Sequence, residues 1–265
     1  MQTLPTYFIS HGGGPWPYIP EMRASMRQLE ASLLVISQAL ASPPKAVLMI
    51  SGHWEAEQFT IMSSENPTMV YDYGGFPAYT YQIKYPAPGA PWLVARLKAL
   101  IESAGLPIAT DDQRGFDHGA FAPMAIMYPE ANVPVIQLSL QRDFDPAQHL
   151  ALGRALAPLR DENILIIGSG FSYHNLRRMG SSAQAPSAQF DAWLQHSLVE
   201  RTPEQRVTDL MHWQYAPAAR IAHPREDHLL PLMVAVGAAE HDKAECCYHE
   251  THFFGGVVAS SFKFG

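Results

Sequence analysis

The fold of this chain is decided by a run of apolar residues that leads into a histidine, AVLMISGH at positions 46–53. His11 likewise follows the run 7–10, and His174 follows the run 164–167 after a short Gly/Ser turn. Runs that are apolar throughout and rich in β-branched residues are typical of strands buried on both faces, as in parallel α/β sheets. Because the C-terminal ends of parallel strands share one edge, where such sheets bind ligands, we expect these histidines to converge there.

Strand-like and helical segments alternate along the chain. Strand-like runs occur near 6–10, 45–51, 58–63, 133–140 and 163–168, and a tail from 244 to 262 reads as two short strands. Helical patterns occur near 20–40, 91–104, 120–128, 146–158 and 186–200, and another helix is predicted from about Arg225 through Val234, with Pro231 in its first turn. The alternation predicts a single α/β domain over 1–265, in which helices flank a central, mostly parallel or mixed sheet.

Composition narrows the class of protein. The 265 residues carry a net charge of −7, which argues against nucleic acid or an anionic membrane as a partner. There is no apolar stretch of about 18 residues, so no membrane span is expected. Cys246 and Cys247 are adjacent, which excludes a disulfide framework, and no signal peptide is expected, so the predicted location is the cytoplasm. Neither a monomer nor a homo-oligomer is favoured.

His11 begins a glycine-rich turn, His11-Gly12-Gly13-Gly14-Pro15. These glycines lack the spacing of a phosphate-binding loop. The turn resembles a lipase-type oxyanion loop, but the Gly-x-Ser-x-Gly elbow of those enzymes does not occur in the chain. We favour a metal ligand followed by glycines that let a substrate approach the backbone, and the alternative is a capping or core histidine.

Two further histidines have settings that suit a ligand. His53 follows Gly52, which leaves room for a bound group, and Glu55 is a candidate partner for its ring. The alternative is a histidine packed under Trp54. His228 stands at the opening of the helix expected from Arg225, where its ring can point into a crevice.

The remaining histidines divide into three groups. His118 follows Asp117, a candidate helix cap, and its ring is a candidate for orienting a substrate, with a structural role as the alternative. His223 is separated from His228 by Pro224, so we do not expect it to be a second ligand. The others are expected to be structural or exposed to solvent: His149, His196, His212, His241, His249 and His252.

Short motifs then run in order through nearly the whole chain, at 10–12, 51–54, 71–77, 85–89, 115–119, 137–139, 168–170, 174–176 and 226–232. Together they resemble those of the class III extradiol ring-cleavage dioxygenases, the LigB-like superfamily, in its DOPA 4,5-dioxygenase branch. The resemblance implies Fe(II) bound by His11, His53 and His228, an acid/base histidine at His174, and His118 near the substrate. One departure is Gly13, where many members have serine.

The resemblance also implies a reaction, the opening of a catechol-type aromatic ring such as that of DOPA by molecular oxygen, with a muconic semialdehyde-type product. Three ligands on one face of Fe(II) leave adjacent positions for catechol and oxygen. A catechol that chelates the metal loses protons, so a base with a pKa of about 6–7 is useful. His174 is the candidate for this base, and we expect the aromatic loop 71–79 and the residues around Phe116 and His118 to flank the pocket.

Two other functions remain open at this point. A zinc-dependent hydrolase would use the same three histidines with a bound water. Zn(II) also outcompetes Fe(II) for imidazole ligands, so it is able to occupy the site in purified protein. The third interpretation is a metal-binding or interaction protein without turnover.

Overall fold

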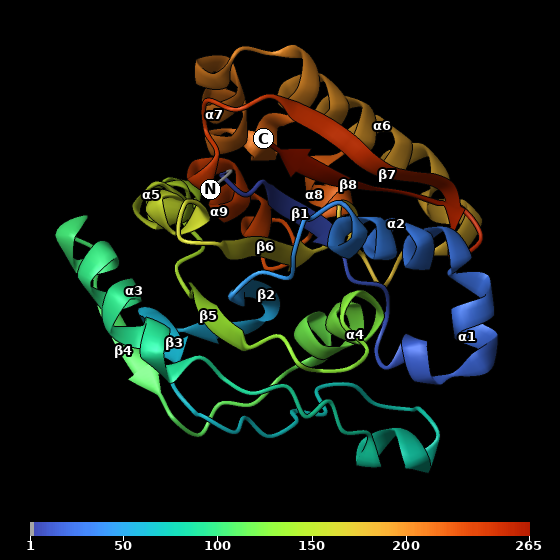
Figure 1. The fold of residues 1–265 in the computed structure, drawn as a ribbon. Coiled ribbons are helices and arrows are strands. Elements are labelled where there is room, and N and C mark those ends of the chain that lie inside the picture. The colour runs from blue at the N-terminus through green and yellow to red at the C-terminus, as the bar shows by residue number, and fades with distance from the viewer. Residues whose placement is uncertain (1–2) are drawn as a thin grey trace.

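The computed structural model, which describes residues 3–265, contains one mixed eight-stranded sheet in the order β4-β3-β5-β2-β6-β1-β8-β7 (Figure 1). The strands are β1 (Thr6–Ser10), β2 (Ala46–Ala56), β3 (Phe59–Met62), β4 (Ile108–Asp111), β5 (Val135–Gln141), β6 (Ile164–Gly170), β7 (Ala244–Phe253) and β8 (Val257–Phe264). Strands β5, β2, β6 and β1 are parallel neighbours, whereas β8 is antiparallel to β1, and β3 is antiparallel to β5. The predicted single α/β domain with a mixed sheet is confirmed.

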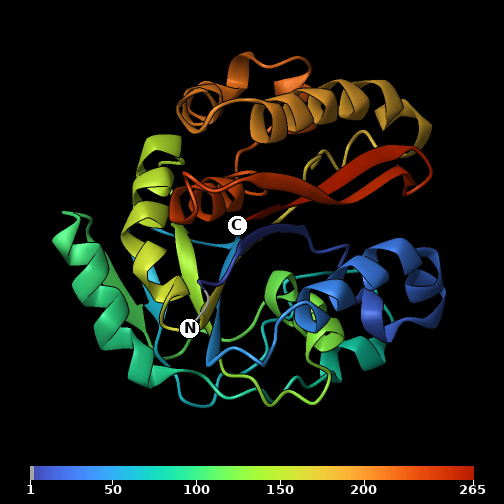
Figure 2. The same ribbon diagram turned by 45° about the horizontal axis from the view of Figure 1, so that its top comes forward.

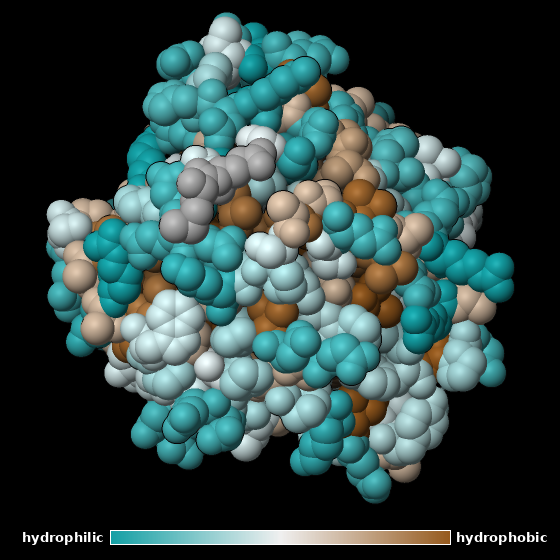
Figure 3. All heavy atoms as spheres, viewed as in Figure 1, coloured by the Kyte–Doolittle hydropathy of each residue, from teal (hydrophilic) through white to brown (hydrophobic). Residues whose placement is uncertain are grey.

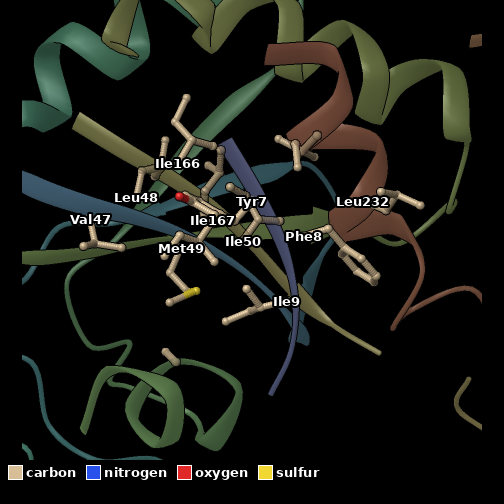
Figure 4. Close-up of a cluster of buried hydrophobic side chains, with 14 of the residues drawn as sticks. Tyr7, Phe8, Ile9, Val47, Leu48, Met49, Ile50, Ile166, Ile167 and Leu232 are labelled. Atoms are coloured by element: carbon tan, nitrogen blue, oxygen red, sulfur yellow. The ribbon is translucent and has the colours of Figure 1, made fainter. Parts of the chain in front are cut away.

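The central strands are buried along their whole length. Every residue of β1 and β6 is buried, as is β2 from Ala46 to Gly52, which is why the sequence shows continuous apolar runs rather than alternation. Figure 4 shows side chains of these three strands packed together, with Leu232 of helix α9 (Leu230–Ala238) beside them. This core fixes the ends of the strands that carry the candidate site.

Helices cover both faces of the sheet. The other helices are α1 (Pro20–Ser25), α2 (Arg27–Gln38), α3 (Pro91–Ser103), α4 (His118–Met127), α5 (Pro146–Leu156), α6 (Gln184–Gln195), α7 (Pro203–Met211) and α8 (Ala219–Ala222). Gly168 of β6 packs against Pro231 of α9, while the next residue, Ser169, donates a hydrogen bond to the carbonyl of Gly119 in α4. Because successive residues of a strand point to opposite faces, α9 and α4 lie on opposite sides of the sheet. Figures 1 and 2 show α6 and α2 on opposite sides of the β7–β8 hairpin.

Several predicted boundaries were wrong. The helix expected over 20–40 is two helices, because Met26 leaves the helical conformation between α1 and α2. The helix expected from Arg225 begins at Leu230, which places Pro231 at its start and leaves His228 in the preceding turn. Strand β2 continues to Ala56, so His53 lies within the strand rather than after it. The tail strands are longer than expected, and β8 reaches Phe264.

Among the α-helices and β-strands of residues 3–265, three were not predicted at all: β4, α7 and α8. The start of α7 carried a readable signal, since Thr202 and Gln205 form a capping box with Pro203 in the first turn.

Within residues 3–265, no helix has both the length and the apolar character needed to cross a bilayer. Figure 3 shows that the face seen in Figure 1 is largely hydrophilic, with hydrophobic residues in small patches.

Candidate metal centre

Three histidine rings from distant parts of the chain come together around the Nε2 atom of His53. His53 Nε2 lies 3.2 Å from His11 Nε2 and 3.1 Å from His228 Nε2. Two imidazoles that bind one ion at about 2.1 Å, with an angle of roughly 90–110° between them, have nitrogens about 3.0–3.4 Å apart. The measured separations therefore fit a shared metal ion, and the convergence expected from the sequence is present in the structure.

The opposite nitrogen of each ring faces an oxygen. His11 Nδ1 lies 3.1 Å from Ser169 Oγ, His53 Nδ1 lies 3.1 Å from Asp72 Oδ2, and His228 Nδ1 lies 3.0 Å from Asp227 Oδ2. The last two pairs are electrostatic contacts rather than hydrogen bonds, and the last of them joins neighbouring residues. Partners of this kind place the ring proton on Nδ1 and leave the Nε2 lone pair free for a metal.

The three rings are held in the neutral state that metal binding requires. Burial, reinforced by the neighbouring histidines, holds the pKa values of His11 and His228 well below the usual range. Burial, followed by the proximity of His118, lowers the pKa of His53 to about 4, although Asp117 and Asp72 act in the opposite direction. At neutral pH each imidazole therefore offers a lone pair and not a second proton.

Glycines allow the three backbone segments to approach. A Cβ atom at Gly170 would lie 2.1 Å from the carbonyl oxygen of His228, and a Cβ atom at Gly52 would lie 3.0 Å from that of Asp227. Gly170 also accepts a hydrogen bond from the backbone N–H of His11. A side chain at Gly170 would therefore push the turn that carries His228 away from the sheet. The register of β2 against β5 also shifts between Ile50 and Glu55, the stretch that contains His53.

His118 joins this group through a carboxylate that sequence reasoning did not single out. Its Nδ1 lies 2.9 Å from Asp72 Oδ1, and its backbone N–H donates to the same oxygen. Burial raises the pKa of Asp72, but the hydrogen bond and charge of His118 outweigh burial, so the pKa is lowered overall. Asp117 caps α4, as expected, by accepting from the backbone N–H of Ala120. The expected partner of His53, Glu55, instead binds Arg225 at 2.5 Å.

His174 lies against His228. Its ring stacks on that of His228, with ring centroids 3.3 Å apart and planes inclined by 12°. Its backbone N–H binds the carbonyl of Ala222, whereas no group in residues 3–265 hydrogen-bonds its imidazole. Burial lowers its pKa, and Asp227 acts in the opposite direction. The ring is therefore close to His228 and has free nitrogens.

All five histidines line one cavity of about 720 Å³. Asp72, Tyr73, Gly74 and Phe76 contribute to its wall, so the prediction that the aromatic loop flanks the pocket is confirmed. Phe116 does not line it, contrary to our expectation, because its side chain is buried near Tyr85. The rim is apolar and includes Met22, Leu176, Met179 and Phe254. A flat, apolar molecule with a few polar groups at one end suits such a cavity.

Comparisons with known proteins agree with this geometry. The family model "Catalytic LigB subunit of aromatic ring-opening dioxygenase" matches residues 5–265. The chain is 42% identical to the 4,5-DOPA dioxygenase extradiol of Beta vulgaris, over 98% of this chain and 96% of that protein. It is 34% identical to the Escherichia coli K12 protein of the same name, over 89% and 85%. A crystal structure of an uncharacterized E. coli K12 protein matches with a TM-score of 0.79 and 27% identity, over 99% of this chain and all of the other. The chain belongs to the LigB family of class III extradiol ring-cleavage dioxygenases, in the branch that contains the 4,5-DOPA dioxygenases.

Proposed function

We propose that this enzyme uses Fe(II), held by His11, His53 and His228, to open the ring of a catechol-type aromatic with molecular oxygen. The product would be a muconic semialdehyde-type acid. The observation that carries the proposal is the convergence of the three Nε2 atoms, two of whose separations are 3.1 and 3.2 Å. Each of the three rings is neutral and turns its other nitrogen toward an oxygen, as ligands of Fe(II) require.

Fe(II) in such a site supplies adjacent open positions at which catechol and oxygen meet, and it makes the catechol hydroxyls more acidic. The protein must then accept a proton from the substrate. His174 and His118 both line the cavity, where the ring of His118 lies beside that of His53 and the ring of His174 stacks on that of His228. We assign His174 to proton transfer, because its free ring nitrogens are able first to take up a proton and later to return it during ring opening.

The rest of the cavity orients the substrate. Tyr73 and Phe76 present aromatic side chains to the space above the histidines, and catechol has an apolar face that suits them. The glycine turn 12–14 brings backbone rather than side chains to the cavity. The substrate diol would therefore lie at the histidine end, while its ring substituent would extend towards the apolar rim.

The test is reconstitution with different metals. Purified protein is stripped with a chelator and reloaded without oxygen with Fe(II) or Zn(II), and a panel of catechols that includes DOPA, protocatechuate and caffeate is then added together with oxygen. We expect a yellow ring-opened product and one equivalent of oxygen consumed only with Fe(II). Turnover with Zn(II) in the absence of oxygen uptake would instead support the zinc hydrolase that the sequence left open.

A further inference from the structure

A single carboxylate in the cavity contacts two of its histidines. Asp72 places Oδ2 3.1 Å from Nδ1 of His53 and Oδ1 2.9 Å from Nδ1 of His118. We propose that Asp72 is a positioning residue of this site, which holds both imidazoles in the tautomer protonated on Nδ1 and so directs both Nε2 lone pairs away from itself. This inference rests on the proposed function, because it takes His53 as a metal ligand.

The tautomers follow from the hydrogen-bonding capacity of the groups. An ionised carboxylate only accepts hydrogen bonds, and a neutral imidazole has one N–H and one acceptor nitrogen. His118 donates its Nδ1 proton to Asp72, and the negative charge of the same carboxylate, 3.1 Å from Nδ1 of His53, favours the proton on that nitrogen too. In the neutral rings both Nε2 atoms are then acceptors. For His53 this is the ligand form, and its Nε2 faces those of His11 and His228. For neutral His118 it means that Nε2 accepts a hydrogen bond from a substrate hydroxyl and has no proton to donate.

The other nearby carboxylates do not serve this purpose. Asp117 is occupied by Ser51, Gln137 and Arg114. Asp227 lies 3.0 Å from Nδ1 of His228, its neighbour in the sequence, and it groups with His174 rather than with His53 or His118. Asp72 is therefore the carboxylate that faces both His53 and His118.

The loop that carries Asp72 is fixed by bonds that do not involve the histidines. Tyr71 donates its hydroxyl to the carbonyl of Ile83 at 2.8 Å, and Tyr73 donates to the carbonyl of Thr80 at 2.7 Å. These anchors lie on each side of Asp72 in the sequence. The carboxylate is therefore in place before any metal binds, as a positioning role requires.

The first experiment reads the tautomers in metal-free protein. Histidine is labelled with ¹⁵N, and the rings of His53 and His118 are assigned by comparison with His53→Ala and His118→Gln proteins. We expect wild type to show both rings protonated on Nδ1, and Asp72→Ala to shift both towards the other tautomer. Asp72→Asn retains one acceptor oxygen, so it should restore only one ring. Glu55→Gln is the matched control, since Glu55 is two residues from His53 but binds Arg225, and it should change neither ring.

The second experiment measures Zn(II) affinity by competition with a chelator. Loss of a partner that orients a metal-binding histidine commonly weakens metal affinity or activity by about 10–100-fold. We expect a loss in this range for Asp72→Ala and no loss for Glu55→Gln. With Fe(II) loaded to saturation, the Asp72→Ala protein should show a lower kcat with a smaller change in KM, because orientation of His118 rather than substrate contact is lost.

The outcomes separate this inference from the proposed function. If wild type opens no catechol ring, the proposed function fails, while the tautomers and Zn(II) affinity still test Asp72. If Asp72→Ala leaves the tautomers of both rings and the metal affinity unchanged, the positioning role is overturned. If that variant does not fold, as judged by circular dichroism, Asp72→Asn decides, and the inference then fails if both rings keep their proton on Nδ1 with unchanged Zn(II) affinity.

Discussion

His149 and the histidines of the cavity are all sheltered from solvent, but their ring nitrogens face different kinds of atoms. His149, in α5, donates from Nδ1 to the carbonyl of Asp145 at 2.7 Å and accepts the backbone N–H of Gln141 at Nε2. In the cavity, by contrast, the Nε2 atoms of His11, His53 and His228 face one another. A buried histidine whose two nitrogens are satisfied by backbone is part of the fold, whereas acceptors directed at a common point require a further group.

The largest test of this comparison replaces one histidine from each group. His53→Ala should lose tightly bound metal and reduce ring opening by at least about 10³-fold, because a catalytic metal supplies several kcal/mol of transition-state stabilisation. His149→Gln should retain both metal and activity. Metal content by elemental analysis and steady-state rates are measured on the same samples. Loss of metal from the His149 variant would show that hydrogen-bonded ring nitrogens do not separate a structural histidine from a metal ligand.

The next largest effect is expected at His174. His174→Ala should keep its metal and lose about 10²–10⁴-fold in turnover, the usual contribution of a positioned acid/base. Metal content is compared with rate for the variant loaded with Fe(II). If metal is lost in parallel with activity, His174 belongs with the ligands. If metal and rate both survive, it is a bystander, and His118 becomes the better candidate for proton transfer.

A smaller effect is expected at the rim of the cavity. Phe254→Ala removes an apolar side chain, 41% exposed, that lines the opening. KM for catechols with an apolar substituent should rise by about 3–10-fold, from the loss of roughly 1 kcal/mol of contact, while kcat changes little. Trp92→Ala, an exposed aromatic on α3 that does not line the cavity, is the control. Equal effects on substituted and unsubstituted catechol would show that the rim does not contact the substituent.

The last test concerns stability and pH rather than catalysis. Burial lowers the pKa of His149 to about 4, while in the unfolded chain it is about 6.5. As the pH falls below about 6.5, the unfolded state takes up a proton that the folded state does not, so the stability from this group declines until about pH 4. The slope is at most about 1.4 kcal/mol per pH unit. Urea unfolding of metal-free wild type and His149→Gln at pH 7, 6 and 5 should show a shallower decline for the variant, and identical slopes would contradict the assignment.

The sequence predicted the fold well where the complete burial of a strand leaves an unbroken run of apolar residues. The runs of β1, β2 and β6 predicted buried parallel strands, and the histidines associated with their C-terminal ends predicted the location of the site. His228 was found through its motif, although the helix after it begins later than expected. β4 was missed because the strand is only four residues long and partly buried, so its pattern of apolar residues is weak.

Contacts between segments that are far apart in the chain leave no such pattern in the sequence, so they could not be predicted from it. Glu55 was the nearest carboxylate to His53 in the sequence, but the turn before α9 brings Arg225 to it. Asp72 lies in an irregular loop whose path is set by tertiary contacts, so its link to both His53 and His118 has no local signature. The sequence predicted candidates for the residues that carry the chemistry, whereas only the fold shows which other groups contact them.

The position of β1 bears on when the enzyme becomes able to take up its metal. β1 pairs with β6 and β8, so none of its sheet neighbours exists until the ribosome has passed Ile164. His228 is also synthesised long after His11, so the three rings cannot come together until His228 has been added to the chain. Long-range pairing of this kind delays folding until most of the chain has been made. Metal loading is therefore expected to follow the synthesis of α9, and a nascent chain stalled before His228 should bind metal far more weakly than the released protein.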